Sequence, residues 1–214
     1  IKKTMMGGKI PRKKARDTMK HLRQYIRQIL LTEGMNTPDM LPDNVVVVIQ
    51  QKDSMFYRVY YASKRHPKTP ARDPYGKITF FRPRTEYRGN CDEAFVVGVA
   101  AADDGWGPLL YDVAIEQSTM AGKGLTSDRQ TVSDEAQDVW WKYLTKRTDV
   151  ESHQLDDLAN TRTPEEEDNC DQDIARSTIT GATTTWVDSP LSKRYTKAPT
   201  TIKALEKAGK LVRL

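Results

Sequence analysis

An eight-residue apolar run at 95–102 (Phe-Val-Val-Gly-Val-Ala-Ala-Ala) has the length of a strand covered on both faces. Gly105 and Gly107 follow it and allow a turn too tight for a Cβ atom. Pro108 suits the first turn of a helix, where its missing N–H would have had no partner. We therefore predict a buried strand that passes through a tight turn directly into a helix.

Helical periodicity and helix-ending residues predict four helices. In the first, Met19, Leu22, Ile26 and Ile29 form one apolar stripe. The third begins at Ser133, a preferred N-cap residue, and has acids in its first turn. The predicted helices are residues 15–32, the segment from the turn to 121, 133–147 and 201–208.

Two segments rich in β-branched and aromatic residues, 44–51 and 55–61, are joined through Lys52-Asp53-Ser54. This arrangement predicts an antiparallel hairpin. Further strands are predicted at 77–82, 125–128, 149–155 and 210–214, whereas the basic, proline-rich residues 63–76 should form an exposed loop.

Together these elements predict a mixed α/β or α+β fold with a mostly antiparallel sheet flanked by helices. We expect three regions along the chain. Residues 1–34 would form a basic N-terminal arm and helix, and residues 35–155 the core. Residues 156–214 would form a long, polar, irregular extension that ends in a short helix and strand.

Composition favours one core with additional polar surface, because 37% of the residues are hydrophobic and 29% are charged. No apolar run approaches the length of a membrane span, and no signal-peptide pattern is seen. The context of Cys91 and Cys170 predicts no bridge, which favours an intracellular or released-particle setting. The chain begins at Ile1, which processing or trimming would equally explain.

Charge is unevenly distributed along the chain. Residues 1–27 carry ten Lys or Arg residues against one acid, whereas residues 163–173 are strongly acidic. One interpretation is a pair of interaction segments, the basic one for nucleic acid phosphates and the acidic one for a basic neighbour, including another copy. The other interpretation is solvated, partly disordered segments.

The turn itself has two interpretations. Free N–H groups at the start of a helix can hold a phosphate, and the helix dipole favours negative charge there. The same Gly-x-Gly pattern also occurs in an ordinary tight connection between a strand and a helix.

Residues 15–155 resemble the GNAT superfamily of acyl-CoA N-acyltransferases in their order of elements and in this turn. In that family an Arg/Gln-x-x-Gly-x-Gly/Ala loop after a central strand holds the coenzyme A pyrophosphate. Gly105, Trp106 and Gly107 stand in the matching place. The resemblance implies a GNAT-like fold, acetyl-CoA as cofactor, no metal, and N-acetyltransferase activity.

Nearly all of the chain is also similar to a group of tailed-bacteriophage proteins described as acetyltransferase-like. The similarity lies in residues 22–30, 105–112, 124–129 and 189–195. It implies an alternative function, a virion or assembly protein that keeps the fold without catalysis. Such a protein would bind other phage proteins or itself through its termini, and nucleic acid through its basic arm. It would lie in the host cytoplasm or the assembled virion, without a membrane.

The chain departs from the enzyme pattern on the cofactor side. The family's Arg or Gln falls at Ala102, and Asp103 and Asp104 follow it. Each carboxylate would repel a pyrophosphate by about 1 kcal/mol at near-surface separations. Alternatively, both point away, cap the helix or pair with Lys or Arg.

The catalytic residues also differ from the family pattern. A family helix carries Asn-x-x-Ala-x-x-x-Tyr, whose Tyr protonates the leaving thiolate, but this chain has Ser133-x-x-Ala136-x-x-x-Trp140. Because Trp has no acidic proton to give, Tyr143, Tyr111 or water would have to replace it. The general base stays open, with Asp92 or Glu93 before the strand as candidates.

Other chemistry finds little support in the sequence. The three histidines are isolated, and the acids at 168–173 lack the calcium-loop pattern. Asp112 and Glu116 are four residues apart on one helix, which favours exposed charges over a catalytic pair. Neither a P-loop nor a Gly-x-Ser-x-Gly motif occurs. The aromatic residues at 56–61 and 80–81 favour a strand core over a base-stacking surface.

Overall fold

The structure, a computed structural model, describes residues 36–68, 75–83, 89–171 and 185–214. The chain divides into two compact units, Ile1–Glu33 and Gly34–Leu214, and the fold below is that of the second. The basic arm and the helix predicted at 15–32 lie outside the described residues.

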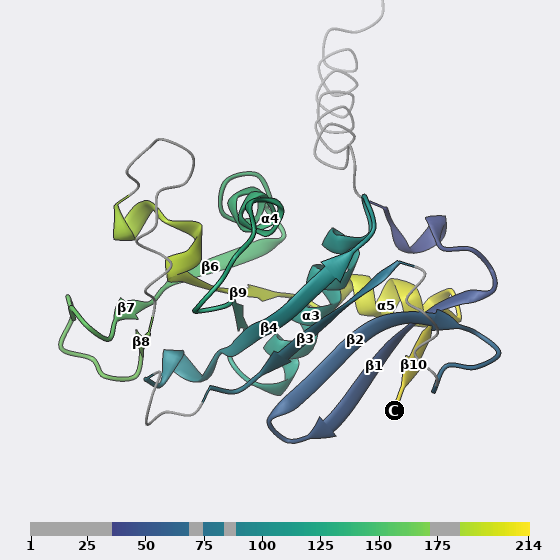
Figure 1. Ribbon diagram of the computed structural model, residues 1–214, viewed down its shortest axis with the longest axis horizontal. Coiled ribbons are helices and arrows are strands. Elements are labelled where there is room, and N and C mark those ends of the chain that lie inside the picture. The colour runs from purple at the N-terminus through teal and green to yellow at the C-terminus, as the bar shows by residue number, and fades with distance from the viewer. Residues whose placement is uncertain (1–35, 69–74, 84–88, 172–184) are drawn as a thin grey trace, which may run out of the picture. The chain divides into compact units, whose positions relative to one another are not determined.

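A mixed, mostly antiparallel sheet forms the frame of this unit (Figure 1). Its eight strands run in the spatial order β10-β1-β2-β3-β4-β5-β9-β6, with β10–β1 and β4–β5 as the parallel pairs. The strands are β1 (Val45–Asp53), β2 (Phe56–Ser63), β3 (Gly76–Phe81), β4 (Phe95–Ala102), β5 (Leu125–Thr126), β6 (Val150–Gln154), β9 (Lys193–Lys197) and β10 (Leu211–Arg213). The predicted α+β class and mostly antiparallel sheet are therefore confirmed.

Helices and short turns complete the unit. The α-helices are α3 (Gly107–Ala121), α4 (Asp134–Thr145) and α5 (Thr200–Lys207), and the 3₁₀ turns are η1 (Pro38–Met40), η2 (Cys91–Glu93), η4 (Trp186–Asp188) and η5 (Pro190–Ser192). A small second sheet pairs β7 (Asp156–Asp157) with β8 (Asn169–Cys170). In Figure 1, α3 crosses behind β3 and β4. It is the central helix, because every residue from 109 to 118 is buried.

The predicted hairpin and the main helices form where the side-chain pattern placed them. β1 and β2 pair antiparallel, with Val47 opposite Tyr61 and Ile49 opposite Val59, so the branched and aromatic side chains of one face meet in the core. Ser133 caps α4 by accepting a hydrogen bond from the backbone N–H of Ala136. Burial of Tyr57, Tyr60, Tyr61 and Phe80 confirms that the aromatic strands are core.

One prediction about β4 is wrong. The strand is covered only at its start, where Phe95, Val96 and Val97 are buried, whereas residues 99–102 are exposed. The reason is the shortness of β5, which pairs with Phe95 and Val96 and then ends. The second half of β4 therefore lacks the cover that its apolar sequence predicted.

The predicted last helix and strand form as α5 and β10, but the prediction of an irregular chain before them is wrong for residues 193–197, which form β9. β9, which the sequence did not predict, lies between β5 and β6. β10 pairs with β1 at the opposite edge of the sheet. The last part of the chain thus supplies an inner strand and an edge strand of the core.

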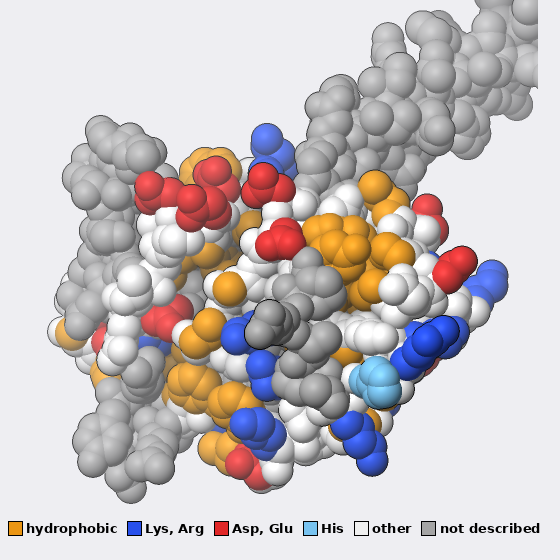
Figure 2. All heavy atoms as spheres, turned by 45° about the vertical axis from the view of Figure 1, so that its right-hand side comes forward, with side chains coloured by type: hydrophobic (Ala, Val, Ile, Leu, Met, Phe, Trp, Pro, Cys, Tyr) orange, Lys and Arg blue, Asp and Glu red, His pale blue; other side chains and the backbone are white. Residues whose placement is uncertain are grey.

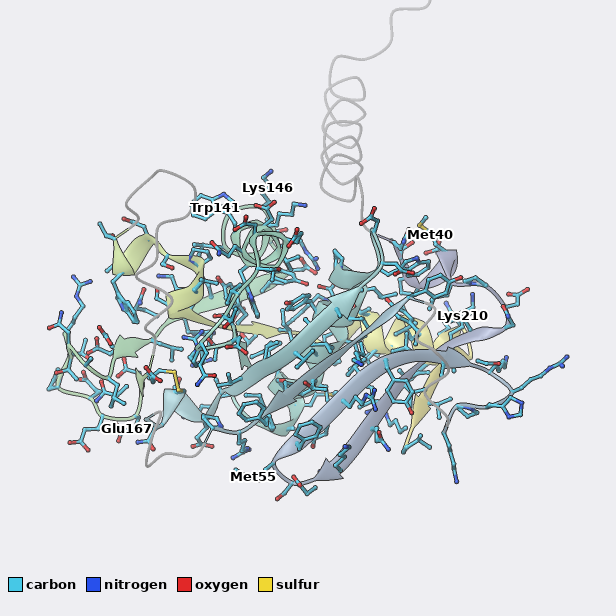
Figure 3. The ribbon with its side chains drawn as sticks, in the orientation of Figure 1. Met40, Met55, Trp141, Lys146, Glu167 and Lys210 are labelled. Carbon is cyan, nitrogen blue, oxygen red and sulfur yellow. A yellow bond between two sulfur atoms is a disulfide. The ribbon has the colours of Figure 1, made fainter. Side chains whose placement is uncertain are left out.

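The prediction that the two cysteines form no bridge is also wrong. Cys91 and Cys170 form a disulfide with a Cα–Cα distance of 4.5 Å. Both are fully buried, together with Leu155. The bridge, visible in Figure 3 near Glu167, ties the turn before β4 to the β7–β8 loop.

Candidate functional site

β4 and β5 separate after two residue pairs, and a cavity lies at the far end of β4. Pairing with β5 includes only Phe95 and Val96, whereas pairing with β3 continues to Ala102. Among the described strands, none pairs with the second side of residues 97–102. The cavity has a volume of about 490 Å³ and is lined by the ends of β3 and β4, the turn, and the first turns of α3 and α4.

The predicted Gly-Trp-Gly turn forms one wall of this cavity. Gly105 has a φ of +80°, a conformation that glycine adopts without strain. The Trp106 N–H donates to the Asp103 carbonyl at 3.0 Å, and the Tyr61 hydroxyl donates to the Trp106 carbonyl at 2.8 Å. Gly105 and Gly107 line the cavity, while Trp106 packs against Tyr61 and Tyr75. Hydrogen bonds at both the N–H and the carbonyl of Trp106 therefore hold the turn in place.

The start of α3 has no side-chain cap. Trp106 holds the N-cap position without a cap hydrogen bond, and Pro108 lies in the first turn. The remaining first-turn N–H groups have no acceptor inside the helix, so they are available to an anion or to water. Because Gly107 and Pro108 line the cavity, this helix end belongs to the site.

Among the described residues that line the cavity, carboxylates outnumber cations. Asp103, Asp104 and Glu135 belong to this lining, and Lys77 is its one basic residue. Asp103 and Asp104 are exposed, and within the described part of the chain no ion pair reaches either carboxylate. Hydrogen bonds from the Glu135 backbone N–H and, to a smaller extent, from the Ser133 hydroxyl hold the pKa of Glu135 below its ordinary value. On the face drawn in Figure 2, acidic side chains gather in the upper part and Lys and Arg in the lower part.

The two candidate tyrosines have different surroundings. Tyr111 is 5% exposed and lines the cavity, and its hydroxyl makes no hydrogen bond to any described residue. Burial, with a smaller contribution from Asp128, raises the pKa of Tyr111 well above its ordinary value. Tyr143 does not line the cavity, and its hydroxyl donates to Asp112 at 2.8 Å. Burial, and then the Asp112 charge, raises the pKa of Tyr143 as well.

Trp140, in the place of the family tyrosine, is a core residue that is 1% exposed. Its ring packs edge-on against Tyr111, with ring centroids 5.3 Å apart, and tilted against Tyr195 at 5.0 Å. Trp140 therefore supports the cavity wall through Tyr111.

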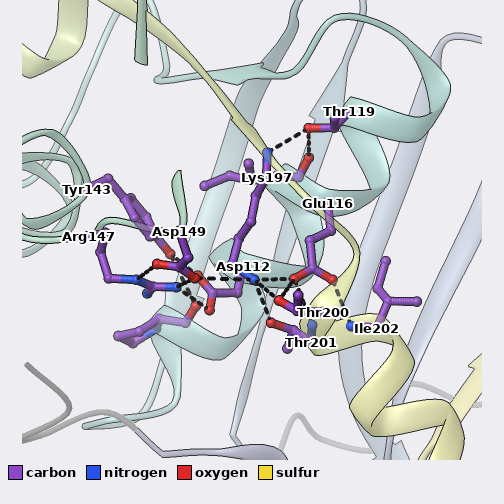
Figure 4. Close-up of polar contacts among 12 residues, drawn as sticks. Asp112, Glu116, Thr119, Tyr143, Arg147, Asp149, Lys197, Thr200, Thr201 and Ile202 are labelled. Carbon is purple, nitrogen blue, oxygen red and sulfur yellow. Dashed lines mark hydrogen bonds and ion pairs between the residues drawn. The ribbon is translucent and has the colours of Figure 1, made fainter. Parts of the chain in front are cut away.

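Asp112 and Glu116 are buried rather than exposed, so that prediction is wrong (Figure 4). Asp112 accepts from Tyr143 and from Arg147, the latter at 3.0 Å. Arg147 also binds Asp149 through two hydrogen bonds of 2.7 Å. These hydrogen bonds and ion pairs join α3 to α4 and to the start of β6.

Glu116 forms the second half of the same buried network. Its carboxylate pairs with Lys197 of β9 and accepts the backbone N–H groups of Thr201 and Ile202 at 2.8 and 2.7 Å (Figure 4). Lys197 also donates to the Thr200 and Thr201 hydroxyls and lies 3.6 Å from Asp149. The sequence carried no signal for these contacts, because their partners are about 80 residues apart.

The candidate bases Asp92 and Glu93 lie before the first residue of β4, at the opposite end of the strand from the cavity. Asp92 pairs with Lys123 at 2.9 Å and with Arg194. Burial opposes the ionised form, but these two cations outweigh it and lower the pKa of Asp92. Within the described residues, neither acid lines the cavity, whose carboxylates are those of the turn and α4.

In the part of the chain that the structure describes, no group of His, Cys, Asp and Glu side chains is arranged to hold a metal ion. No helix in that part is long and apolar enough to cross a membrane. No protein-family model, curated protein or solved structure matches the chain.

Proposed function

We propose that this chain is a GNAT-like acyl-CoA-dependent N-acetyltransferase whose acetyl-CoA site is the cavity at the end of β4. The observation that carries the proposal is the separation of β4 from β5 beside the uncapped start of α3. It combines a strand edge that no described strand uses, a helix N-terminus and an open cavity of about 490 Å³ in one place.

The start of α3 supplies the anion-binding part of the proposed site. First-turn N–H groups and the helix dipole favour a diphosphate there. A Cβ atom at Gly107 would lie 3.7 Å from the nearest neighbour, the Ala102 Cβ atom, so the space above this residue is open. The backbone of the turn can therefore approach a phosphate closely.

The free edge of β4 supplies the second part. Residues 97–102 have backbone groups on the side away from β3 that no described strand uses. An extended ligand with amide groups, such as the pantetheine arm, can pair with such an edge as a short strand would.

Tyr111 is the residue proposed to act on the leaving sulfur. Bound acetyl-CoA would supply the thioester, whose C–S bond breaks as the acceptor nitrogen bonds to the carbonyl carbon. Tyr111 stays protonated because burial raises its pKa, so its hydroxyl can donate a hydrogen bond to the departing sulfur. A thiol with a pKa near 8.5 needs no stronger acid. The proton lost by the acceptor nitrogen would pass to a lining carboxylate, directly or through water.

Calorimetry with acetyl-CoA tests the binding step. We expect micromolar binding that is lost in Gly107→Asp and kept in Gly107→Asn, an uncharged variant of the same shape. The open space at Gly107 lets both variants fold, so the comparison isolates charge. Absence of binding by the unmodified chain, or equal binding by the two variants, would refute the proposed site.

Turnover is tested separately with Tyr111→Phe. Removing one hydrogen-bond donor that acts on developing charge should lower kcat about 10²-fold and leave acetyl-CoA binding unchanged. Tyr143→Phe is the matched control, because that hydroxyl binds Asp112 rather than lining the cavity. An unchanged kcat in Tyr111→Phe would exclude this role.

The alternative function is a virion or assembly protein that keeps the fold without catalysis. The three carboxylates around the cavity favour it, since they oppose a diphosphate. Its test is mass spectrometry of purified phage particles, in which the protein should be present at a fixed copy number. Absence from the particles would refute it.

A further inference from the structure

We infer that the face of the sheet opposite α3 binds single-stranded nucleic acid. It is the face of β1 to β4 that looks toward the viewer in Figure 1, where α3 crosses behind β3 and β4. Side chains alternate between the two faces of a strand. Tyr57 and Val59 of β2 belong to the same core cluster as the side chains of α3, so Phe56 and Arg58 lie on the opposite face.

Two aromatic side chains lie next to each other on this face and are only partly buried. Phe56 of β2 is directly opposite Phe81 of β3, and neither belongs to the buried core. A Cβ atom at Gly98 would lie 2.8 Å from Cε1 of Phe81, so this ring extends over β4 where the strand has no side chain. Partly exposed rings on a sheet give unpaired bases a surface on which to stack.

The cations beside these rings have no anionic partner within the described residues. The guanidinium carbon of Arg58 lies 5.1 Å from the centroid of the Tyr60 ring, and the ammonium group of Lys52 lies 5.3 Å from that of Phe56. Neither cation forms an ion pair with a described residue. The Arg58 Nε atom is buried and has no hydrogen-bond partner there either. Arg58 therefore carries donor groups that phosphate oxygens can accept.

The segment after β2 adds positive charge to the same face. Tyr60 points to this face like Arg58, and its hydroxyl donates to the Pro67 carbonyl at 3.0 Å, so the segment folds back beside it. Asp53, in the hairpin turn, opposes this charge, but its carboxylate already accepts the Met55 backbone N–H at 2.7 Å. Three basic side chains of the segment are exposed, namely Lys64, Arg65 and Lys68.

Rings and cations on one face favour a single strand over two other anionic partners. The bases of a duplex are stacked on each other, so a duplex would use only the cations. A carboxylate-rich protein surface would leave the two rings without a stacking partner. A single strand offers unpaired bases to Phe56 and Phe81 and phosphates to Arg58 and Lys52.

Fluorescence anisotropy of the full chain with an oligothymidylate of about 12 nucleotides tests the inference. The corresponding oligouridylate shows which sugar is preferred, and a DNA duplex of the same length is measured in parallel. We expect micromolar binding at low salt that weakens as salt is added. None of the four side chains that would contact the strand lines the cavity, so the result does not depend on the proposed function.

Two variants separate the phosphate contact from the stacking contact. Arg58→Gln should reduce the slope of log K against log salt concentration by about 0.7, the value for one phosphate of a single strand. Phe56→Leu should weaken binding about tenfold and leave this slope unchanged, because stacking releases no counterions. Phe81→Leu is the second stacking variant, and circular dichroism shows that each variant is folded.

Matched changes elsewhere on the molecule are the controls. Lys203→Gln removes an exposed positive charge from α5, and Trp141→Leu removes a partly exposed ring from α4. Neither should change binding. Residues 1–33 are the same in every variant, so their positive charge contributes equally to all measurements.

Three results would overturn the inference. The first is absence of binding by the full chain, or equal binding by the parent chain and the folded variants of the face. The second is equal binding of the duplex, which offers no unpaired base to the rings. The third is binding of an oligoglutamate peptide as tight as that of the oligothymidylate, which would assign the face to an acidic protein.

Discussion

Glu116 stabilises a helix to which it does not belong. It lies on α3, is fully buried, and binds the first N–H groups of α5 as well as Lys197 of β9. Both charges are satisfied by several hydrogen bonds, which is the condition under which a buried pair is tolerated. The Glu116 carboxylate therefore connects three elements, α3, α5 and β9.

Replacing Glu116 by Gln should lower the free energy of unfolding by about 3 kcal/mol, because it leaves Lys197 buried beside an uncharged group. Urea unfolding measures the change. Adding Lys197→Met should recover part of the loss, since it removes the uncompensated charge. A loss below about 1 kcal/mol would contradict the proposed contribution of the buried Glu116–Lys197 pair to stability.

The surface pair of Glu206 and Arg213 is the matched comparison. Their side chains are 49% and 46% exposed. We expect Glu206→Gln to change the free energy of unfolding by less than about 1 kcal/mol.

Asp92 should make stability depend on acid pH. Its folded pKa lies below its unfolded pKa, despite burial, because Lys123 and Arg194 favour the carboxylate. A lowered folded pKa gives stability above about pH 4, which is lost as the pH falls through the folded pKa. Asp92→Asn should therefore be less stable than the parent chain at pH 7, by on the order of 1 kcal/mol. The difference should shrink below about pH 4 in thermal unfolding across pH, and a constant difference would refute this cause.

At the scale of elements, the disulfide joins η2 to β8 across 79 residues of sequence. A bridge that closes a long loop typically contributes about 2–4 kcal/mol, mainly by restricting the unfolded chain. We expect reduction with dithiothreitol to lower the melting temperature of the parent chain. Cys91→Ser/Cys170→Ser should melt at a temperature that the reductant does not change. Equal melting of the oxidised and reduced parent would show that the bridge adds no stability.

The sequence predicted elements whose patterns are local. α3 follows a glycine turn and contains Pro108, and α4 starts at a Ser cap, so both were found near their observed bounds. β9 was missed because its inward positions are Lys193, Tyr195 and Lys197. Two of these are lysines, so the alternation of a buried strand is hidden by residues that usually face water.

For the site, too, the sequence predicted the features with a local pattern and missed those that depend on distant contacts. The turn at 105–107, which leads from β4 into α3, followed from glycine spacing, whereas the cavity beside it did not. Burial of Asp112 and Glu116 did not, because it depends on partners far along the chain. Neither did the position of Glu135 near Asp103 and Asp104, because Glu135 lies on α4 and not in the turn. Contacts between residues that are far apart along the chain produce no periodic pattern in a single sequence.

For the whole molecule, the position of β9 makes the end of the chain essential to the fold. A chain that ends at residue 184 lacks β9, α5 and β10. We expect it to show no cooperative unfolding transition, whereas a chain that begins at Gly34 keeps the whole second unit and should unfold cooperatively. Circular dichroism during heating measures both. A cooperative transition in the shortened chain would contradict this assignment.

The same strand order affects how the protein emerges from the ribosome. β5 and β6 are synthesised well before β9, yet they meet only through it. Until the last residues are available, each of these two strands has an unpaired edge to which other chains can add. A delay in translation just before the codons of β9 should therefore increase aggregation more than a delay placed before those of β5.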